Sequence, residues 1–214
     1  MIDWLVEVHA KFKQVPETLF LTVNIIDRFL ELKSTRRSKL QLVGVAALLL
    51  ASKYEEIYPP EIRDLVYLTD HAYTKREILE MENQIVTALQ YEMTVPTIHT
   101  FLCRYLKAAH ADRAIVQLAC YIAERCLQEY SMCSFLPSTT AATCIWIARK
   151  TIQRQSSWSP TLLKYTKLDE VDMESCADAM KVFLDNPSSK EQEAVKRKYS
   201  SSRYGSVAKL EMKF

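Results

Sequence analysis

Two charged residues occupy helical positions where the pattern predicts apolar neighbours. Lys53 follows Leu50 by three residues, and Glu82 precedes Ile85 by three residues on the apolar stripe of a predicted helix over 74–89. In one interpretation Lys53 extends into solvent and Glu82 marks the edge of the stripe. In the other, the two charges form a polar pair at the rim of an apolar surface, which suits binding to the backbone of another protein's helix. The pattern alone leaves both interpretations open.

Catalytic and metal-binding patterns are absent from the sequence. It contains no G-x-x-x-x-G-K, G-x-G-x-x-G, H-E-x-x-H or G-x-S-x-G motif. The histidines are scattered, and the six cysteines never form C-x-x-C. Glu55 and Glu56 cannot act as a catalytic pair, because adjacent helical side chains point about 100° apart. We therefore expect no enzyme activity, no metal and no cofactor.

The composition indicates an all-α protein. The 214 residues are 49% hydrophobic and 25% charged but include only 2 glycines and 7 prolines, which argues against Gly-rich phosphate loops and β-rich folds. The net charge of +2 gives no global reason to expect nucleic acid or an anionic membrane as a partner. The longest apolar run, 42–51, is about half the length of a bilayer span, and no secretory signal is visible. Because the cysteines resemble buried thiols, we expect the nucleus and cytoplasm as the location.

Helical periodicity covers most of the chain and repeats once. Residues 40–54 are apolar almost all round, which predicts a central helix enclosed by others. This run recurs at a separation of 97 residues, so that 48–53 corresponds to 145–150. Chance similarity between two amphipathic helices is the alternative explanation. The repeat predicts two similar helical bundles joined near 91–97. The other matched positions are Leu21, Ile25, Asp27, Arg28 and Leu30 with Leu118, Ile122, Glu124, Arg125 and Leu127.

The segment LASKYEEIYPPEI at 50–62 resembles the signature of the cyclin box of mitotic cyclins. The second half of the chain resembles the family more loosely, and 198–202 is similar to the end of B-type cyclins, which favours B-type over A-type. Further segments resemble the family in the same order: IDWLVEVH at 2–9, PETL at 16–19, IDRFL at 26–30, KLQLVG at 39–44 and YLTD at 67–70.

The resemblance implies an all-α protein of two tandem five-helix cyclin folds, each built around a central apolar helix. We expect an N-terminal cyclin box over 1–93, a C-terminal cyclin fold over 94–186 and a polar C-terminal tail over 187–214. The chain is expected to be truncated at its N-terminus, within the first helix of the box. The arginine that the family pairs with the position of Asp27 would then be missing, and a partly buried, unpartnered Asp27 would destabilise the fold.

The resemblance also implies a function without catalysis. Cyclins bind a cyclin-dependent Ser/Thr kinase as a heterodimer and activate it by packing on its αC helix and activation loop, here in G2/M control. Lys53 and Glu82 match the family positions that hydrogen-bond the kinase backbone around αC. The expected apolar contacts beside them are Leu50, Tyr54, Val86 and Tyr91.

A second implied site is a docking groove for Arg-x-Leu motifs of substrates or inhibitors. Trp4 and its aliphatic neighbours can receive the leucine, while Glu7, one helical turn later, can pair with the arginine. Trp4 could equally be an ordinary core residue. The expected groove residues are Met1, Trp4, Glu7, Leu40 and Gln41.

Two other functions of paired cyclin folds are weighed against this one. A transcription initiation factor that binds DNA would need a basic groove, whereas the cationic clusters at 33–39 and 196–198 lie in a predicted turn and tail. An inactive cyclin-fold scaffold would tolerate loss of Lys53 and Glu82 without an effect on kinase activity.

Overall fold

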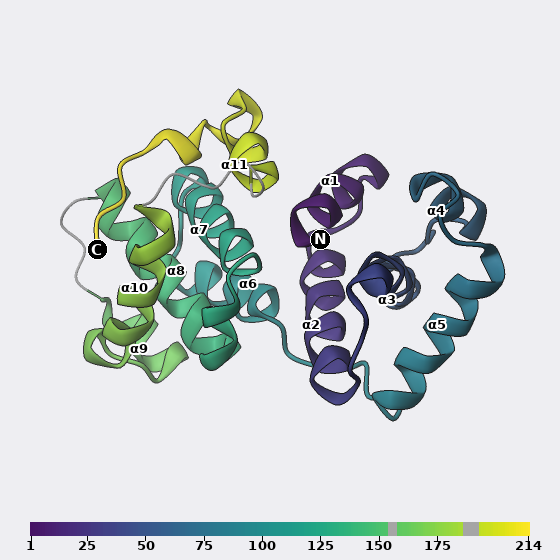
Figure 1. The fold of residues 1–214 in the computed structure, drawn as a ribbon. Helices are drawn as coiled ribbons and strands as arrows, with labels where there is room; N and C mark the ends of the chain where they lie inside the picture. Colours follow the sequence, from purple (N-terminus) through teal and green to yellow (C-terminus); the bar gives the residue numbers. More distant parts are fainter. Residues whose placement is uncertain (154–157, 186–192) are drawn as a thin grey trace. The chain divides into compact units, whose positions relative to one another are not determined.

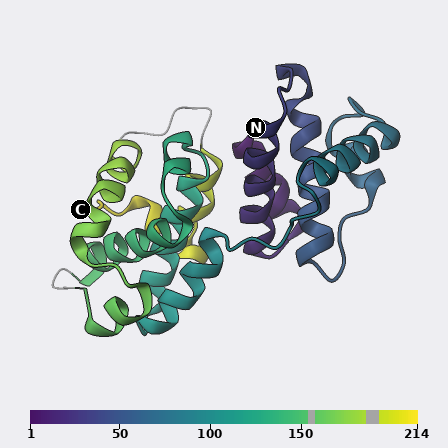
Figure 2. The ribbon, with the colours of Figure 1, turned by 90° about the horizontal axis from the view of Figure 1, so that it is seen from below.

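The computed structural model describes residues 1–153, 158–185 and 193–214. The chain divides into two compact units, Met1–Thr97 and Ile98–Phe214. All regular secondary structure in the described residues is helical, as Figures 1 and 2 show. The prediction of an all-α fold is therefore confirmed. None of the helices in these ranges is both long and apolar enough to span a bilayer.

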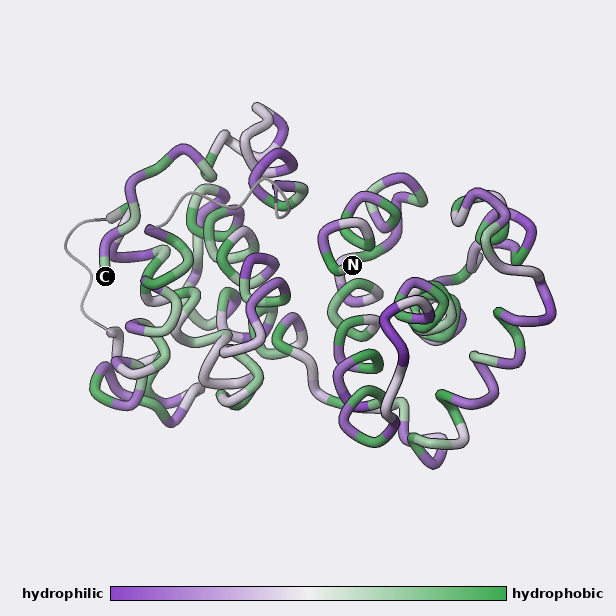
Figure 3. Tube along the Cα trace, in the orientation of Figure 1, coloured by the Kyte–Doolittle hydropathy of each residue, from purple (hydrophilic) through white to green (hydrophobic). Residues whose placement is uncertain are grey.

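The first unit surrounds a central apolar helix, α3. Helices α2 and α5 pack on it, and Val43, Leu48 and Ala51 are fully buried along its length. Figure 3 shows the hydrophobic colouring of α3 among the other helices of the unit. This confirms the expectation for residues 40–54. The helices are α1 (Ile2–Phe12), α2 (Pro16–Leu32), α3 (Leu40–Glu55), α4 (Ile62–Leu68) and α5 (Lys75–Ala88), with a 3-10 turn η1 (Arg37–Lys39) before α3.

The second unit repeats this arrangement around α8. Helices α6, α7 and α10 pack on α8, whose Ile145 and Ala148 are fully buried. The starts of α7 and α8 lie 97 residues after those of α2 and α3, so the sequence repeat is a structural repeat. The helices are α6 (Ile98–Ala108), α7 (Arg113–Cys126), α8 (Pro137–Gln153), α9 (Pro160–Thr166), α10 (Glu170–Leu184) and α11 (Ala194–Tyr199), with 3-10 turns η2 (Tyr130–Ser134), η3 (Ser202–Tyr204) and η4 (Val207–Lys209).

The C-terminal segment differs from the expected polar tail. Its first residues lie outside the described ones, but from Glu193 onward the chain packs on the second unit rather than extending into solvent. Val195 and Tyr199 of α11 are buried, and α11 contacts α7. This segment is too short for its apolar residues to form a recognisable helical pattern. Its polar composition therefore suggested a tail.

Asp27 also differs from expectation. It is exposed on α2 and has a polar partner, so the predicted destabilisation by a buried, unpartnered carboxylate is wrong. Its neighbour Arg28 donates from Nη1 to the carbonyl oxygen of Glu92, 2.9 Å away. The side chain of Asp27 lies on the solvent side of the helix, where ionisation carries little desolvation cost.

The buried thiol of Cys176 on α10 gives the second unit a pH-dependent stability. Burial raises the pKa of this thiol to about 11, above that of an unfolded cysteine. The folded state therefore binds the thiol proton more tightly than the unfolded state does. The resulting contribution to the free energy of unfolding is complete below about pH 8.5 and is lost as the pH rises toward 11. Between pH 8 and 10.5 the loss from this one group is about 2 kcal/mol. We expect Cys176→Ala to flatten the fall in unfolding free energy over that range, measured by denaturant titration.

The exposed Cys103 of α6 supplies the control, because folding does not bury its thiol. Cys103→Ala should leave the fall in unfolding free energy with pH as it is in the unmodified chain. If Cys176→Ala leaves the fall in unfolding free energy with pH unchanged, the thiol of Cys176 is not its source.

Candidate functional site

Lys53 and Glu82 meet across the contact between α3 and α5. The Nζ atom of Lys53 lies 2.6 Å from Oε1 of Glu82. The Lys53 side chain is 46% exposed and that of Glu82 is 13% exposed, so the pair lies at the edge of the core. The structure thus brings together two charges that are 29 residues apart in the sequence.

The pair keeps unused hydrogen-bonding capacity. An ammonium carries three donors and a carboxylate about four acceptor sites. In the described part of the chain, Lys53 and Glu82 have no polar partner other than each other. The pair can therefore donate to a carbonyl oxygen and accept from an N–H group of a bound protein at the same time.

Contacts around the end of α3 fix the position of Lys53. The neighbouring Ser52 is buried, donates to the carbonyl oxygen of Leu48 at 2.6 Å and accepts from Nε2 of Gln14 at 2.5 Å. At Glu56 the backbone becomes extended, and its carboxylate accepts from the backbone N–H of Val15 at 2.8 Å. Glu56 thereby caps the start of α2, whose own N-cap residue makes no side-chain hydrogen bond.

The four expected apolar contacts offer unequal amounts of surface. Leu50 is 9% exposed and Val86 is half-buried, so both offer little surface to a partner protein. Tyr54 and Tyr91 are 49% and 70% exposed. The hydroxyl of Tyr54 shares a hydrogen bond with Thr94 Oγ1, which leaves the ring face as the surface it presents.

Sequence reasoning missed two exposed apolar residues that follow Lys53 by four and five positions in the chain. Ile57 and Tyr58, in the connection after α3, are 88% and 90% exposed. Large apolar side chains gathered on a surface mark protein interaction sites. Their signal was weak because helical periodicity ends at Glu55, and a residue in a connection has no face that a pattern can assign. We call Lys53, Tyr54, Ile57, Tyr58 and Glu82 the α3–α5 surface.

The five expected groove residues come from α1, from Met1 just before it and from the first turn of α3, and α1 packs against α3. A Cβ at Gly44 would make ordinary van der Waals contacts, at 3.5 Å from both Met1 Sδ and Leu5 Cδ1. Trp4 is half-buried against the core and Glu7 is exposed. Met1 is 41% exposed, and Leu40 and Gln41 are half-buried.

The two cationic clusters belong to different units, and each has a lysine engaged by a carboxylate. Lys39 pairs with Glu77 at 3.2 Å, and Lys198 pairs with the buried Glu124 at 2.6 Å. This arrangement does not favour the DNA-binding alternative.

Each of the two units matches a protein-family model. The model described as "Cyclin, N-terminal domain" matches residues 1–94, and the one described as "Cyclin, C-terminal domain" matches residues 96–213. Cyclin-B2-2 of Oryza sativa subsp. indica is 46% identical over 99% of this chain and 50% of its own length. G2/mitotic-specific cyclin-1 of Medicago sativa subsp. varia is 44% identical over 99% of this chain and 49% of its own length. The chain thus spans about half the length of the curated relatives it matches.

Solved structures share the fold at low sequence identity. A viral cyclin from herpesvirus saimiri superposes with a TM-score of 0.73 and 19% identity, covering 84% of this chain and 82% of that one. A chain of the yeast RNA Pol II CTD kinase CTDK-1 complex superposes with a TM-score of 0.72 and 17% identity, covering 86% and 64%.

Proposed function

Because this chain belongs to the cyclin family and its curated relatives are B-type and G2/mitotic cyclins, we propose that it binds and activates a cyclin-dependent Ser/Thr kinase in G2/M control. In this proposal it is a regulatory subunit and has no catalytic activity of its own. The single observation that carries the proposal is the Lys53–Glu82 pair at the rim of an exposed apolar surface. This surface has the chemistry needed to hold a helix of another protein.

The pair suits the C-terminal end of a kinase helix and the chain that follows it. The last C=O groups of a helix have no intrahelical partners, and the chain beyond the helix offers N–H groups. The remaining donors of Lys53 can bind such carbonyl oxygens, while the second oxygen of Glu82 accepts from an N–H group. Tyr54, Ile57 and Tyr58 would exclude water from these hydrogen bonds and so strengthen them.

Activation then follows from the requirements of kinase chemistry. A kinase holds ATP productively only when its catalytic lysine pairs with a glutamate of αC. A subunit that binds only this state shifts the equilibrium toward it. A shift from 1:99 to 99:1 takes about 5.5 kcal/mol of differential binding, which an interface of standard size can supply.

Titration calorimetry with a purified mitotic cyclin-dependent kinase tests the proposal. We expect a saturable complex of one chain with one kinase. A folded chain that gives no binding heat at several temperatures, and that runs separately from the kinase in sedimentation velocity, would contradict the proposal. Measuring at several temperatures guards against a cancelling enthalpy.

We further propose that α1 and the start of α3 bind Arg-x-Leu segments of substrates or inhibitors. Trp4 and Met1 offer apolar surface for the leucine, and the exposed Glu7 offers a carboxylate for the arginine. Glu7→Lys replaces that attraction by repulsion, so we expect it to weaken binding of a fluorescent Arg-x-Leu peptide by about 30-fold in anisotropy titrations.

Glu31→Lys is the matched control, because Glu31 is an exposed carboxylate of α2 that is not one of the groove residues. It makes the same change in net charge and should leave peptide affinity within about two-fold of the unmodified chain. Equal losses in both variants would show that net charge, rather than Glu7, governs binding.

A further inference from the structure

A cationic cleft lies in the first unit between the α2–α3 connection and α5. Its volume is about 610 Å³, and the apolar part of its wall includes Phe29 and Met81. Lys33, Arg36 and Lys39 also line it, and none of its lining residues is acidic. The cleft shares no lining residue with the α3–α5 surface or with the five groove residues.

Two of the three cations in this cleft are free to bind a ligand. Lys39 is engaged by Glu77, with Nζ 3.2 Å from Oε1, and it also lies over the ring of Tyr73. Lys33 and Arg36 are exposed, and their side chains have no acidic partner in the described ranges. The cleft therefore presents an uncompensated positive charge.

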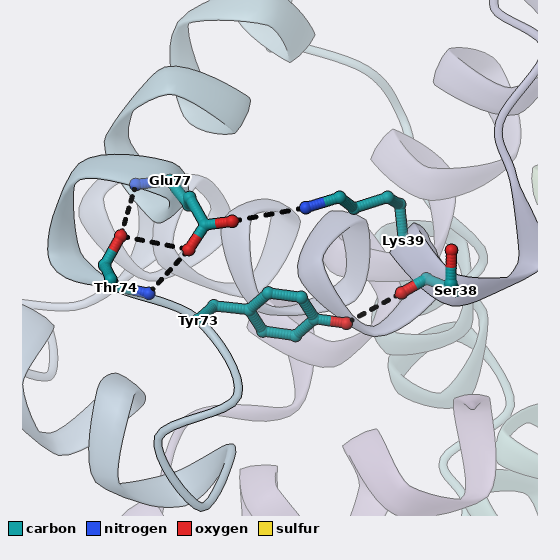
Figure 4. Close-up of polar contacts among 5 residues, drawn as sticks. All are labelled: Ser38, Lys39, Tyr73, Thr74 and Glu77. Atoms are coloured by element: carbon teal, nitrogen blue, oxygen red, sulfur yellow. Dashed lines mark hydrogen bonds and ion pairs between the residues drawn. The ribbon is translucent and has the colours of Figure 1, made fainter.

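The loop that carries these cations is anchored at its end, as Figure 4 shows. The hydroxyl of Tyr73 donates to the carbonyl oxygen of Ser38 at 3.0 Å, and Glu77 holds Lys39. Glu77 is itself fixed by the capping box of α5, accepting from the backbone N–H of Thr74 at 2.9 Å. Hydrogen bonds from the backbone N–H and the hydroxyl of Thr74 lower the pKa of the Glu77 carboxyl, which favours its charged form beside Lys39. The end of the loop is thus held in place before a ligand arrives, which lowers the entropic cost of ordering the loop on binding.

Neutral donors complete the lining of the cleft. Asn83 and Gln84 of α5 are exposed and have no hydrogen-bond partner among the described residues, and the hydroxyl of Ser34 lies on the loop opposite. A phosphate ester carries nearly two negative charges and three acceptor oxygens. One guanidinium, one free ammonium and several neutral donors match a phosphate better than a single carboxylate.

We propose that this cleft binds a phosphoserine or phosphothreonine segment of a partner protein, with an apolar residue of that segment against Phe29 and Met81. The choice of phosphorylated protein as occupant rests on the proposed function, because a kinase partner produces such segments. Arg36 and Lys33 hold the phosphate, and Asn83 and Gln84 complete its hydrogen bonds. The cleft would retain a substrate that has already been phosphorylated once.

The test is peptide binding by the chain alone, so that failure here does not depend on kinase binding. An array presents peptides with a central phosphothreonine and Leu, Ile, Met or Phe at each flanking position, beside the same peptides with Thr or Glu at the centre. The best phosphopeptide is then titrated by fluorescence anisotropy at 150 mM salt. We expect Arg36→Ala to weaken the binding of this phosphopeptide by about ten-fold or more, and Lys33→Ala to weaken it by a smaller factor.

Arg37→Ala is the matched control, because Arg37 is the next residue, is exposed and does not line the cleft. It should change the affinity by less than about two-fold. Equal losses in the Arg36 and Arg37 variants, or equal binding of the Thr peptides, would overturn the proposal. Equal binding of the Glu peptides would overturn it as well, in favour of a site for acidic peptides.

Discussion

Replacing Lys53 and Glu82 together by alanine is expected to weaken kinase binding by about 100-fold or more while the chain stays folded. The pair lies at the rim of an apolar surface, where loss of its charge-assisted hydrogen bonds to the kinase costs about 3 kcal/mol or more. In the free chain the same pair is partly exposed, so its loss costs folding only about 1 kcal/mol or less. Titration calorimetry measures the affinity, and thermal unfolding shows that the fold is kept.

The Arg76–Glu80 pair supplies a matched control on the same helix. Its atoms lie 2.6 Å apart, and both side chains are more than half exposed on α5. Arg76→Ala with Glu80→Ala removes two opposite charges, as the test variant does, and should leave kinase affinity within about two-fold. A Lys53 and Glu82 variant that binds as well as this control would favour the inactive scaffold.

Glu124→Gln is expected to destabilise the second unit by about 3 kcal/mol. The carboxylate is 3% exposed and accepts from Lys198 Nζ at 2.6 and 2.8 Å and from the hydroxyl of Tyr199 at 2.7 Å. An amide cannot balance the ammonium, whose side chain is only 14% exposed. Removing one partner of a buried ion pair costs about 3 to 5 kcal/mol because the other charge remains buried. Urea unfolding measures the loss, and hydrogen exchange of α11 should show it first.

Two further variants separate the ion pair from simple loss of charge. Glu174→Gln removes an exposed carboxylate of α10 and should change stability by less than about 0.5 kcal/mol. Adding Lys198→Met to Glu124→Gln removes the orphaned ammonium and should restore part of the lost stability. If the double variant is as unstable as Glu124→Gln, the ion pair is not the source of the effect.

Local signals in the sequence predicted the framework of the fold. The apolar run at 40–54 identified α3, and the apolar stripe over 74–89 identified α5. The 97-residue repeat predicted α8 from α3. Each of these features depends on residues within one helix, or on a repeated helix. There the spacing of apolar residues in the sequence follows the period of the helix itself.

Long-range contacts explain what the sequence could not reveal. Asp27 and Glu124 occupy equivalent repeat positions, yet Asp27 is exposed and Glu124 is buried because α11 covers α7. Nothing near Glu124 indicates that Lys198 will reach it across 74 residues. For the same reason the sequence identified Lys53 and Glu82 individually but left their pairing open.

The most direct test of the central claim is the activity of a mitotic cyclin-dependent kinase, phosphorylated on its activation loop and titrated with this chain. We expect a phosphorylation rate that rises and saturates at one chain per kinase. The Lys53 and Glu82 variant should need at least about 100-fold more chain to reach half of that rate. A rate that stays at the level of the kinase alone, with the folded chain in excess, would contradict the account.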